Sequence, residues 1–126
     1  LFVFTPEGMW RYLPKKHAIE RVLKEDRRAA MWEHVYARPW LKDAPAIFFI
    51  TANYDITAKK YGKKARRFVD IESGHIGQNL LLQATALGLG CVPLGAYHEK
   101  RVREIVELPR RLTPVYFVAV GRLPEN

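Results

Sequence analysis

The chain has 126 residues, of which 48% are hydrophobic and 27% are charged, as expected for one folded globular domain. No apolar run approaches the ~20 residues that span a bilayer, and the lone cysteine, Cys91, excludes an intrachain disulfide. These features exclude a membrane-spanning protein and a disulfide scaffold, and they favour a cytoplasmic location. The formal net charge of +8 favours an anionic partner.

The first half of the chain predicts a β-hairpin, a helix and a strand. Strand-forming residues at 1–4 and 9–13 flank the turn sequence TPEG. Asp26 is predicted to cap a helix over residues 27–37, which Pro39 ends. Residues 45–54 (PAIFFITANY) are apolar on both faces, which is typical of a central, buried strand.

The second half predicts two further helices and two further strands. The polar segment 55–70 is predicted to be helical only at its start. Ser73 is predicted to cap a helix that runs to Leu87, where Gly88 and Gly90 stop it. Apolar residues surround most of this helix, so we expect it to be buried on nearly every side, in part against another subunit.

A short apolar run (91–94), an amphipathic helix (99–106) and a second buried strand (114–120) complete the order. The chain contains no internal repeat and no interdomain linker. The sequence therefore predicts a single α+β domain over residues 1–126, in which helices pack on one sheet.

The positive charge is concentrated in one segment. Six of the nine residues from 59 to 67 are cationic: Lys59, Lys60, Lys63, Lys64, Arg66 and Arg67. The segment is a solvated charged surface, a phosphate-binding patch or an active-site loop that carries a lysine. Nucleic acid is the least favoured partner, because no nucleic-acid-binding motif is present and stacking aromatics do not alternate with the cations along a strand.

Three other chemical motifs are weak. The segment 88–93 (GLGCVP) lacks the third glycine of a dinucleotide fingerprint, and it follows a helix instead of a strand. The four histidines share no close ligand spacing, so no metal site is predicted. Cys91 is interpreted as a structural thiol, because a nucleophile needs a base that the sequence does not place.

Two segments near the end of the chain suit an anionic, planar ligand. Residues 93–97 (PLGAY) place small residues after a proline, which leaves backbone N–H groups open to a ligand; the alternative is a simple turn. Arg122 follows the last strand, where a guanidinium is able to hold a phosphate.

Taken together, these segments resemble a known family. The motifs follow in the order KYG (60–62), ESGHIGQNL (72–80), ALGLG (86–90), PLGAY (93–97) and VGR (120–122). This order resembles the FMN-dependent nitroreductase superfamily, and within it the SagB-type dehydrogenase branch, which includes azoline oxidases. The family's Arg-rich N-terminal section is missing, so the chain is expected to be the C-terminal portion of the family fold.

The resemblance implies a nitroreductase-like fold with a central, mostly antiparallel sheet, which works as an intertwined homodimer with FMN at the subunit interface. It assigns Pro93 and Leu94 to the lining of the flavin ring, and the main chain of Gly95 and Ala96 to the region of the flavin N5. It assigns Arg122 to the FMN phosphate.

Azoline-oxidising members resemble this chain at the pair Lys60-Tyr61. The resemblance implies that Lys60, with a pKa lowered by the surrounding cations, acts as a base and that Tyr61 supports it.

The expected function is an FMN-dependent oxidoreductase that transfers a hydride between flavin and a nicotinamide or small organic substrate, with NAD(P)H as the candidate electron donor. Two alternatives stay open. One is a non-catalytic, flavin-free relative that serves as a binding or scaffold subunit, and the other is a small basic nucleic-acid-binding protein.

Overall fold

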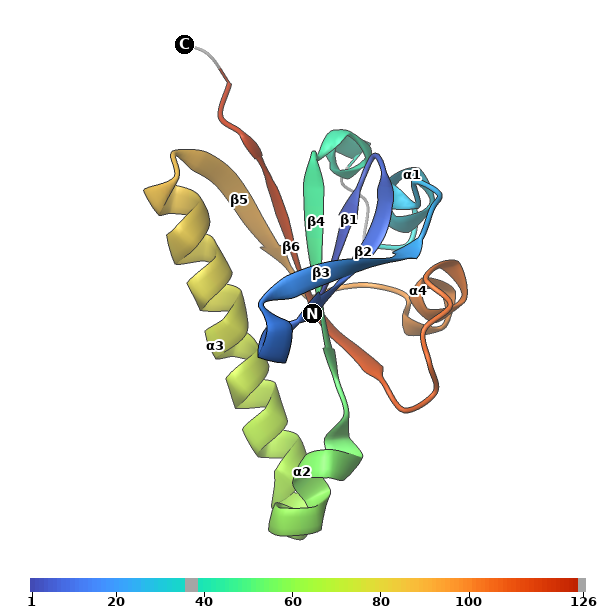
Figure 1. Cartoon of the computed structure of the whole chain (residues 1–126), viewed down its shortest axis with the longest axis vertical. Coiled ribbons are helices and arrows are strands. Elements are labelled where there is room, and N and C mark those ends of the chain that lie inside the picture. Colours follow the sequence, from blue (N-terminus) through green and yellow to red (C-terminus); the bar gives the residue numbers. More distant parts are fainter. Residues whose placement is uncertain (36–38, 125–126) are drawn as a thin grey trace.

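The computed structural model describes residues 1–35 and 39–124. In this part of the chain, six strands form one sheet in the order β3-β2-β1-β4-β6-β5 (Figure 1). Neighbouring strands are antiparallel throughout. The predicted fold class, an α+β domain with a mostly antiparallel sheet packed by helices, is confirmed.

The elements have the following bounds: β1 Phe2–Thr5, β2 Gly8–Leu13, η1 Pro14–Lys16, β3 Ala18–Leu23, α1 Arg28–Trp32, η2 Pro39–Asp43, β4 Ala46–Ala52, α2 Tyr54–Tyr61, η3 Gly62–Lys64, α3 Ala65–Ala86, β5 Leu89–Leu94, α4 Glu99–Ile105 and β6 Thr113–Arg122.

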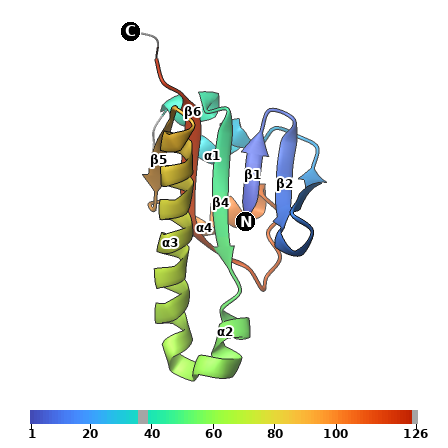
Figure 2. The ribbon, with the colours of Figure 1, turned by 60° about the vertical axis from the view of Figure 1, so that its left-hand side comes forward.

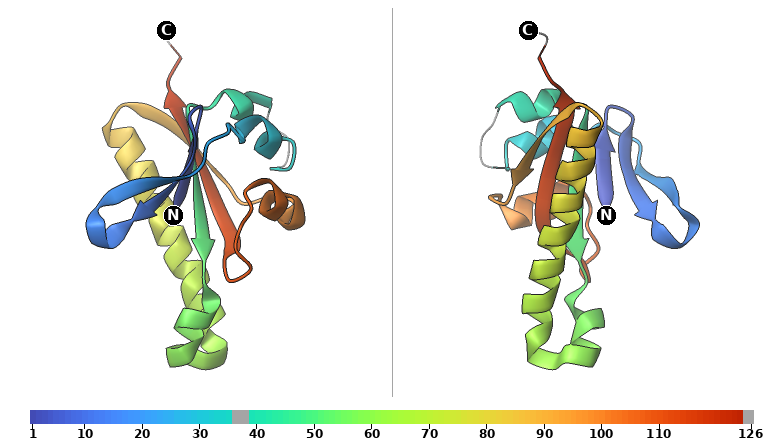
Figure 3. Two further views of the ribbon diagram at one scale, coloured as in Figure 1. Left: turned by 45° about the vertical axis from the view of Figure 1, so that its right-hand side comes forward. Right: turned by 90° about the vertical axis from the view of Figure 1, so that its left-hand side faces the viewer.

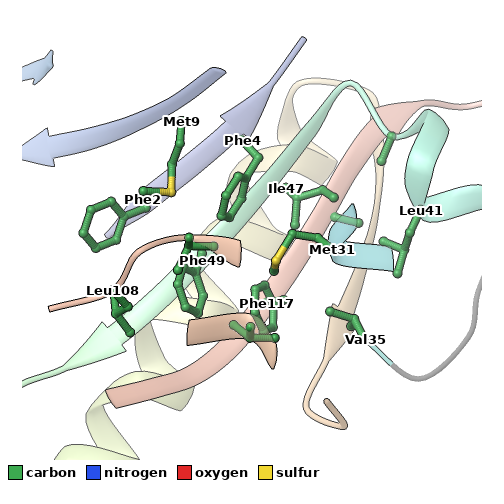
Figure 4. Close-up of a cluster of buried hydrophobic side chains, with 14 residues drawn as sticks. Phe2, Phe4, Met9, Met31, Val35, Leu41, Ile47, Phe49, Leu108 and Phe117 are labelled. Atoms are coloured by element: carbon green, nitrogen blue, oxygen red, sulfur yellow. The ribbon is translucent and has the colours of Figure 1, made fainter. Parts of the chain in front are cut away.

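The adjacent interior strands β4 and β6 are covered on both faces, which explains why their sequences are apolar at consecutive positions. Phe49 and Phe117 face α1, η2 and α4, and their rings stack at a centroid distance of 4.5 Å (Figure 4). On the other face, Val118 and Val120 pack against α3. Figure 2 shows the resulting three layers, with α3 on one side of the sheet and α1 and α4 on the other.

The helix α3 buries a narrow row of residues against the sheet, and Leu80 and Leu81 pack against Val118 and Val120 beside this row. The residues of the row are spaced mostly four apart and are nearly all small: Ala65, Val69, Ser73, Gly77 and Ala84. The other side of the helix is exposed and carries the large apolar residues Phe68, Ile71 and Leu82, with Leu87 just after the helix; Ile76, which is also exposed, lies beside the buried row next to Ser73. The expectation of a helix buried on nearly every side is therefore wrong for the single chain, because only one stripe meets the sheet.

The predicted start of this helix is also wrong. The helix begins at Ala65, and Ser73 lies in its interior, where its hydroxyl donates a hydrogen bond to the carbonyl of Val69 at 2.8 Å. A serine inside a helix, whose hydroxyl donates to a carbonyl of the preceding turn, cannot be distinguished from an N-cap serine by the sequence alone. At the other end Gly88 has a φ of +70°, as expected for the residue that terminates a helix, whereas Gly90 belongs to β5.

Two differences affect the first half of the chain. The helix predicted over 27–37 spans Arg28–Trp32 as α1, and residues 36–38 lie outside the described part. Asp26 accepts the N–H of Arg28 at 3.0 Å, although the N-cap position belongs to Arg27. The strand β3 was not predicted, because it is an edge strand whose mostly exposed residues give no strong apolar pattern.

The hairpin of α2 and the beginning of α3 extend beyond the sheet at the end opposite to Arg122 (Figure 3). The prediction that the segment 55–70 is helical only at its start is wrong, because α2, η3 and the beginning of α3 cover all of it. In the part of the chain that the structure describes, no helix combines the length and apolar character needed to cross a membrane.

A substitution of Phe49, which stacks on Phe117 at the centre of the core, tests this packing. Phe49 is fully buried, so Phe49→Ala is expected to lower the free energy of unfolding by about 3–5 kcal/mol through lost burial and the cavity that remains. Ile19→Ala on the exposed edge strand β3 is the control, with an expected loss of about 1 kcal/mol or less. Urea unfolding measures both, and equal losses would contradict the assigned core.

Candidate functional site

The loop that follows β5 presents an open stretch of backbone. Pro93, Gly95 and Ala96 are exposed, whereas Leu94 packs against the core. Within the described residues, the N–H groups of Gly95 and Ala96 take part in none of the backbone hydrogen bonds of turns and loops. The loop therefore offers two donors to a ligand.

Tyr97 anchors this loop at its far end. Its hydroxyl donates a hydrogen bond to the carbonyl of Pro114 at 2.8 Å, and its ring lies edge-on to Phe117 at 5.3 Å. Burial is the main cause that raises the pKa of Tyr97, with a smaller contribution from Glu99, so the hydroxyl stays a donor at neutral pH. The loop is thus fixed to β6 and does not depend on its own exposed residues for its shape.

The ring of Tyr116 packs against the same loop. A Cβ atom at Gly95 would lie 3.7 Å from its ring, in ordinary van der Waals contact. A Cβ atom at Gly77 would lie 2.8 Å from the ring, which is too close. The ring therefore occupies the space between the α3 helix and the Gly95 loop, and Gly77 is required for this close approach.

Arg122 lies at the opposite end of β5. In the register of β5 and β6, Arg122 pairs with Leu89, and Leu94 pairs with Phe117. Five residues of strand separate the two levels, which is about 17 Å. An elongated ligand that touches both the Gly95 loop and Arg122 must therefore lie along β5.

A pocket of about 460 Å³ adjoins Arg122, between η2 and the paired ends of β5 and β6. Its lining consists of Trp40, Asp43, Ala44, Pro45, Gly90, Cys91, Val92, Ala119, Val120, Gly121 and Arg122. Among the described residues that line it, Arg122 is the only cation and Asp43 the only carboxylate. An anion in this pocket would therefore depend on Arg122.

Lys60 and Tyr61 lie elsewhere, at the end of α2 (Figure 1). Both are exposed, and the Lys60 ammonium lies 5.2 Å from the centroid of the Tyr61 ring. The Tyr61 ring is held edge-on against Phe68 at 5.0 Å. In the described part of the chain, no hydrogen bond, ion pair or ring contact joins this pair to residues 93–96 or to Arg122.

A polar contact that the sequence does not reveal ties α2 to α3. The Tyr54 hydroxyl donates a hydrogen bond of 2.5 Å to Asp70, and the Arg66 guanidinium lies over the Tyr54 ring at 5.7 Å. Burial, followed by the hydrogen bond to Asp70, raises the pKa of Tyr54 to about 12. Tyr54 and Asp70 are sixteen positions apart, so no local sequence pattern indicates their contact, and only the fold reveals it.

The remaining chemical candidates are not brought together. His34 and His98 have ring centroids 6.4 Å apart, and among the described residues no three His, Cys, Asp or Glu side chains form a group that could hold a metal ion. Cys91 is half-buried, with its Sγ 3.8 Å from the carbonyl of Leu81.

The comparison with known families decides the classification. The model of the nitroreductase family matches residues 1–122. The chain belongs to the nitroreductase family. Members of this family are generally FMN-dependent oxidoreductases.

Individual relatives agree with this classification. A Methanocaldococcus jannaschii protein, provisionally named a nitroreductase, is 36% identical over 120 residues, which are 95% of this chain and 60% of that protein. A crystal structure from Anabaena variabilis, with the same provisional name, superposes with a TM-score of 0.89 at 25% identity and covers 98% of this chain and 26% of its own. The chain thus spans three fifths or less of the length of these relatives.

A more distant structure shares the fold. The NADPH:FMN oxidoreductase from Vibrio harveyi, solved as a complex with NAD+, superposes with a TM-score of 0.67 at 20% identity, over 79% of this chain and 47% of that one. The predicted nitroreductase-like fold is therefore confirmed.

The two glycines of α3 test the contact that supports the Gly95 loop. Gly77→Ala is expected to destabilise the protein by about 1–3 kcal/mol, because its Cβ would overlap the Tyr116 ring. Gly74→Ala, one turn earlier and with open space around its Cβ, is expected to stabilise the protein by up to about 1 kcal/mol through helix propensity. Thermal or urea unfolding compares the two variants, and a Gly77→Ala protein as stable as Gly74→Ala would contradict the close packing.

Proposed function

We propose that this chain belongs to an FMN-dependent oxidoreductase that transfers a hydride between flavin and a nicotinamide or small organic substrate. The observation that supports this most is the exposed backbone of Gly95 and Ala96, fixed by Tyr97 and Tyr116 at one end of β5. Arg122 stands at the other end of the same strand.

The residues present fit FMN at both ends. The open N–H groups of Gly95 and Ala96 suit the acceptor nitrogen of a flavin ring, and the exposed Pro93 offers an apolar edge beside them. Arg122 suits the phosphate, although the carboxylate of Asp43 in the same pocket opposes it. When bound, FMN supplies the two-electron hydride chemistry that the side chains lack.

Backbone donors have a specific advantage in this role. An N–H group that faces the flavin nitrogen polarises it and does not titrate between pH 5 and 9, so it holds the ring in one orientation without taking up a proton. The proline and small residues of 93–96 keep side chains away from that approach.

We further propose that Lys60 and Tyr61 are the catalytic pair, with Lys60 as the base and Tyr61 as its support. The cation lies over the Tyr61 ring, and the edge-on contact of Tyr61 with Phe68 holds the ring in place. With this assignment, we propose that the protein belongs to the SagB-type branch of the family.

A homodimer and a cytoplasmic location complete the proposal. The exposed apolar side of α3, which includes Phe68, Ile71 and Leu82, supports an interface with a second copy. We propose that the second copy also brings its Lys60 and Tyr61 to the flavin. The lone Cys91 is consistent with a reducing compartment.

A matched pair of arginine variants tests the phosphate contact. Arg122→Ala is expected to weaken FMN binding about tenfold, because a charge-assisted hydrogen bond is lost. Arg110 is exposed and lies shortly before the first residue of β6, at the end of the strand far from Arg122. Arg110→Ala is therefore expected to leave the affinity for FMN unchanged. Titration followed by flavin fluorescence measures both dissociation constants. Equal affinities of the two variants for FMN would contradict the assignment of Arg122 to the phosphate.

Neighbouring lysines test the catalytic pair. Lys60→Ala is expected to lower kcat about 10²-fold or more while FMN stays bound, because a positioned base is lost. Lys59→Ala removes the same charge from an adjacent exposed position and is expected to retain kcat. Steady-state kinetics on flavin-loaded protein distinguishes the variants, and a Lys60→Ala enzyme with normal kcat would contradict the assignment.

A further inference from the structure

Six cations form a continuous exposed surface at the end of the α2–α3 hairpin. We call this surface the basic tip: Lys59, Lys60, Lys63, Lys64, Arg66 and Arg67. No acidic residue occurs between Asp55 and Asp70. Among the described residues, Arg66 alone of the six forms an ion pair, with Asp70 at 3.9 Å.

The basic tip does not stabilise the fold. Lys63, Lys64, Arg66 and Arg67 surround the first turn of α3, where the helix dipole makes positive charge unfavourable and where no acid is present. Like charges at this spacing also repel one another. Such an arrangement costs stability, so a function outside the fold is the better explanation for it.

The tip also carries an apolar, planar surface. Tyr61 and Phe68 are 44% and 39% exposed, and their rings pack edge-on at 5.0 Å among the cations. The hairpin extends beyond the sheet (Figure 2). Exposed rings within a positive field suit an organic anion with a flat ring system.

We propose that the basic tip selects a planar substrate that carries a carboxylate or a phosphate group. This inference rests on the proposed function, because Lys60 is one of the cations of the basic tip and Tyr61 is exposed next to it. The field of the other five cations raises the local concentration of an anionic substrate beside this pair. The anionic group belongs either to the electron acceptor or to the nicotinamide donor, since NADPH carries one phosphate more than NADH.

The experiment measures kcat/KM for two acceptors of similar size and shape, the anion para-nitrobenzoate and the neutral para-nitrobenzamide, with flavin-loaded protein. In the first two-electron step, NAD(P)H and one proton reduce the nitro group to a nitroso group, which releases NAD(P)+ and water. A second series holds the acceptor constant and compares NADPH with NADH. Both series are run at low and at high ionic strength.

The structure offers a closely matched control. Lys63→Glu/Lys64→Glu alters two adjacent exposed lysines in the 3-10 turn η3. Lys15→Glu/Lys16→Glu alters two adjacent exposed lysines in the 3-10 turn η1, which joins β2 and β3 at the opposite edge of the sheet from β5. Both double variants change the net charge equally, so only the position differs.

We expect the unaltered protein to prefer the more anionic substrate of one series about tenfold at low ionic strength, and added salt to reduce this preference. The tip variant should lose the preference and the control variant should keep it. A preference in the acceptor series places the anion on the acceptor, and one confined to the NADPH series places it on the donor.

Equal kcat/KM in both series, or equal effects of the two double variants, would overturn the inference while the oxidoreductase function stands. Absence of turnover with every acceptor and donor would overturn the proposed function, and this inference with it.

Discussion

The ring of Tyr116, packed between a glycine of α3 and the loop after β5, is the contact on which the arrangement of the site depends. Gly77 lets the helix come close enough to touch the ring, and the other side of the ring supports Gly95. The neighbouring residue, Phe117, points to the opposite face and stacks on Phe49 in the core. The strand β6 therefore connects the core directly to the site.

This connection gives the site a rigid base with an exposed surface. The backbone of residues 95 and 96 is open, whereas the next residue, Tyr97, is fixed because its hydroxyl donates a hydrogen bond to the carbonyl of Pro114. Arg122 lies at the far end of the paired strands, about 17 Å away by strand rise. A long ligand with a planar head and an anionic tail matches this spacing, and FMN has both parts.

Much of the fold was predictable because burial leaves a strong pattern in the sequence. The strands around Phe49 and Phe117 are apolar on both faces, and the structure buries both faces. The turn between β1 and β2 was recognised from its proline and glycine. In contrast, β3 is exposed at the sheet edge and α3 touches the sheet through small residues, so apolar periodicity revealed neither the strand nor the start of the helix.

The candidate site was less predictable than the fold. The residue types at 93–96 and at Arg122 indicated a planar, anionic ligand, but their distance from one another depends on the register of β5 and β6. The supporting contacts, Tyr116 with Gly77 and Tyr54 with Asp70, join residues that are far apart in the sequence. Local patterns contain no information on such pairs, because tertiary packing alone brings them together.

The central claim is that the open backbone of Gly95 and Ala96 receives the flavin ring. The most direct measurement follows the amide resonances of the protein by NMR during addition of FMN. The account predicts that the amides of Gly95 and Ala96 shift and become protected from hydrogen exchange as FMN binds, together with a shift at Arg122. Binding of FMN that leaves the amides of Gly95 and Ala96 unchanged would contradict it.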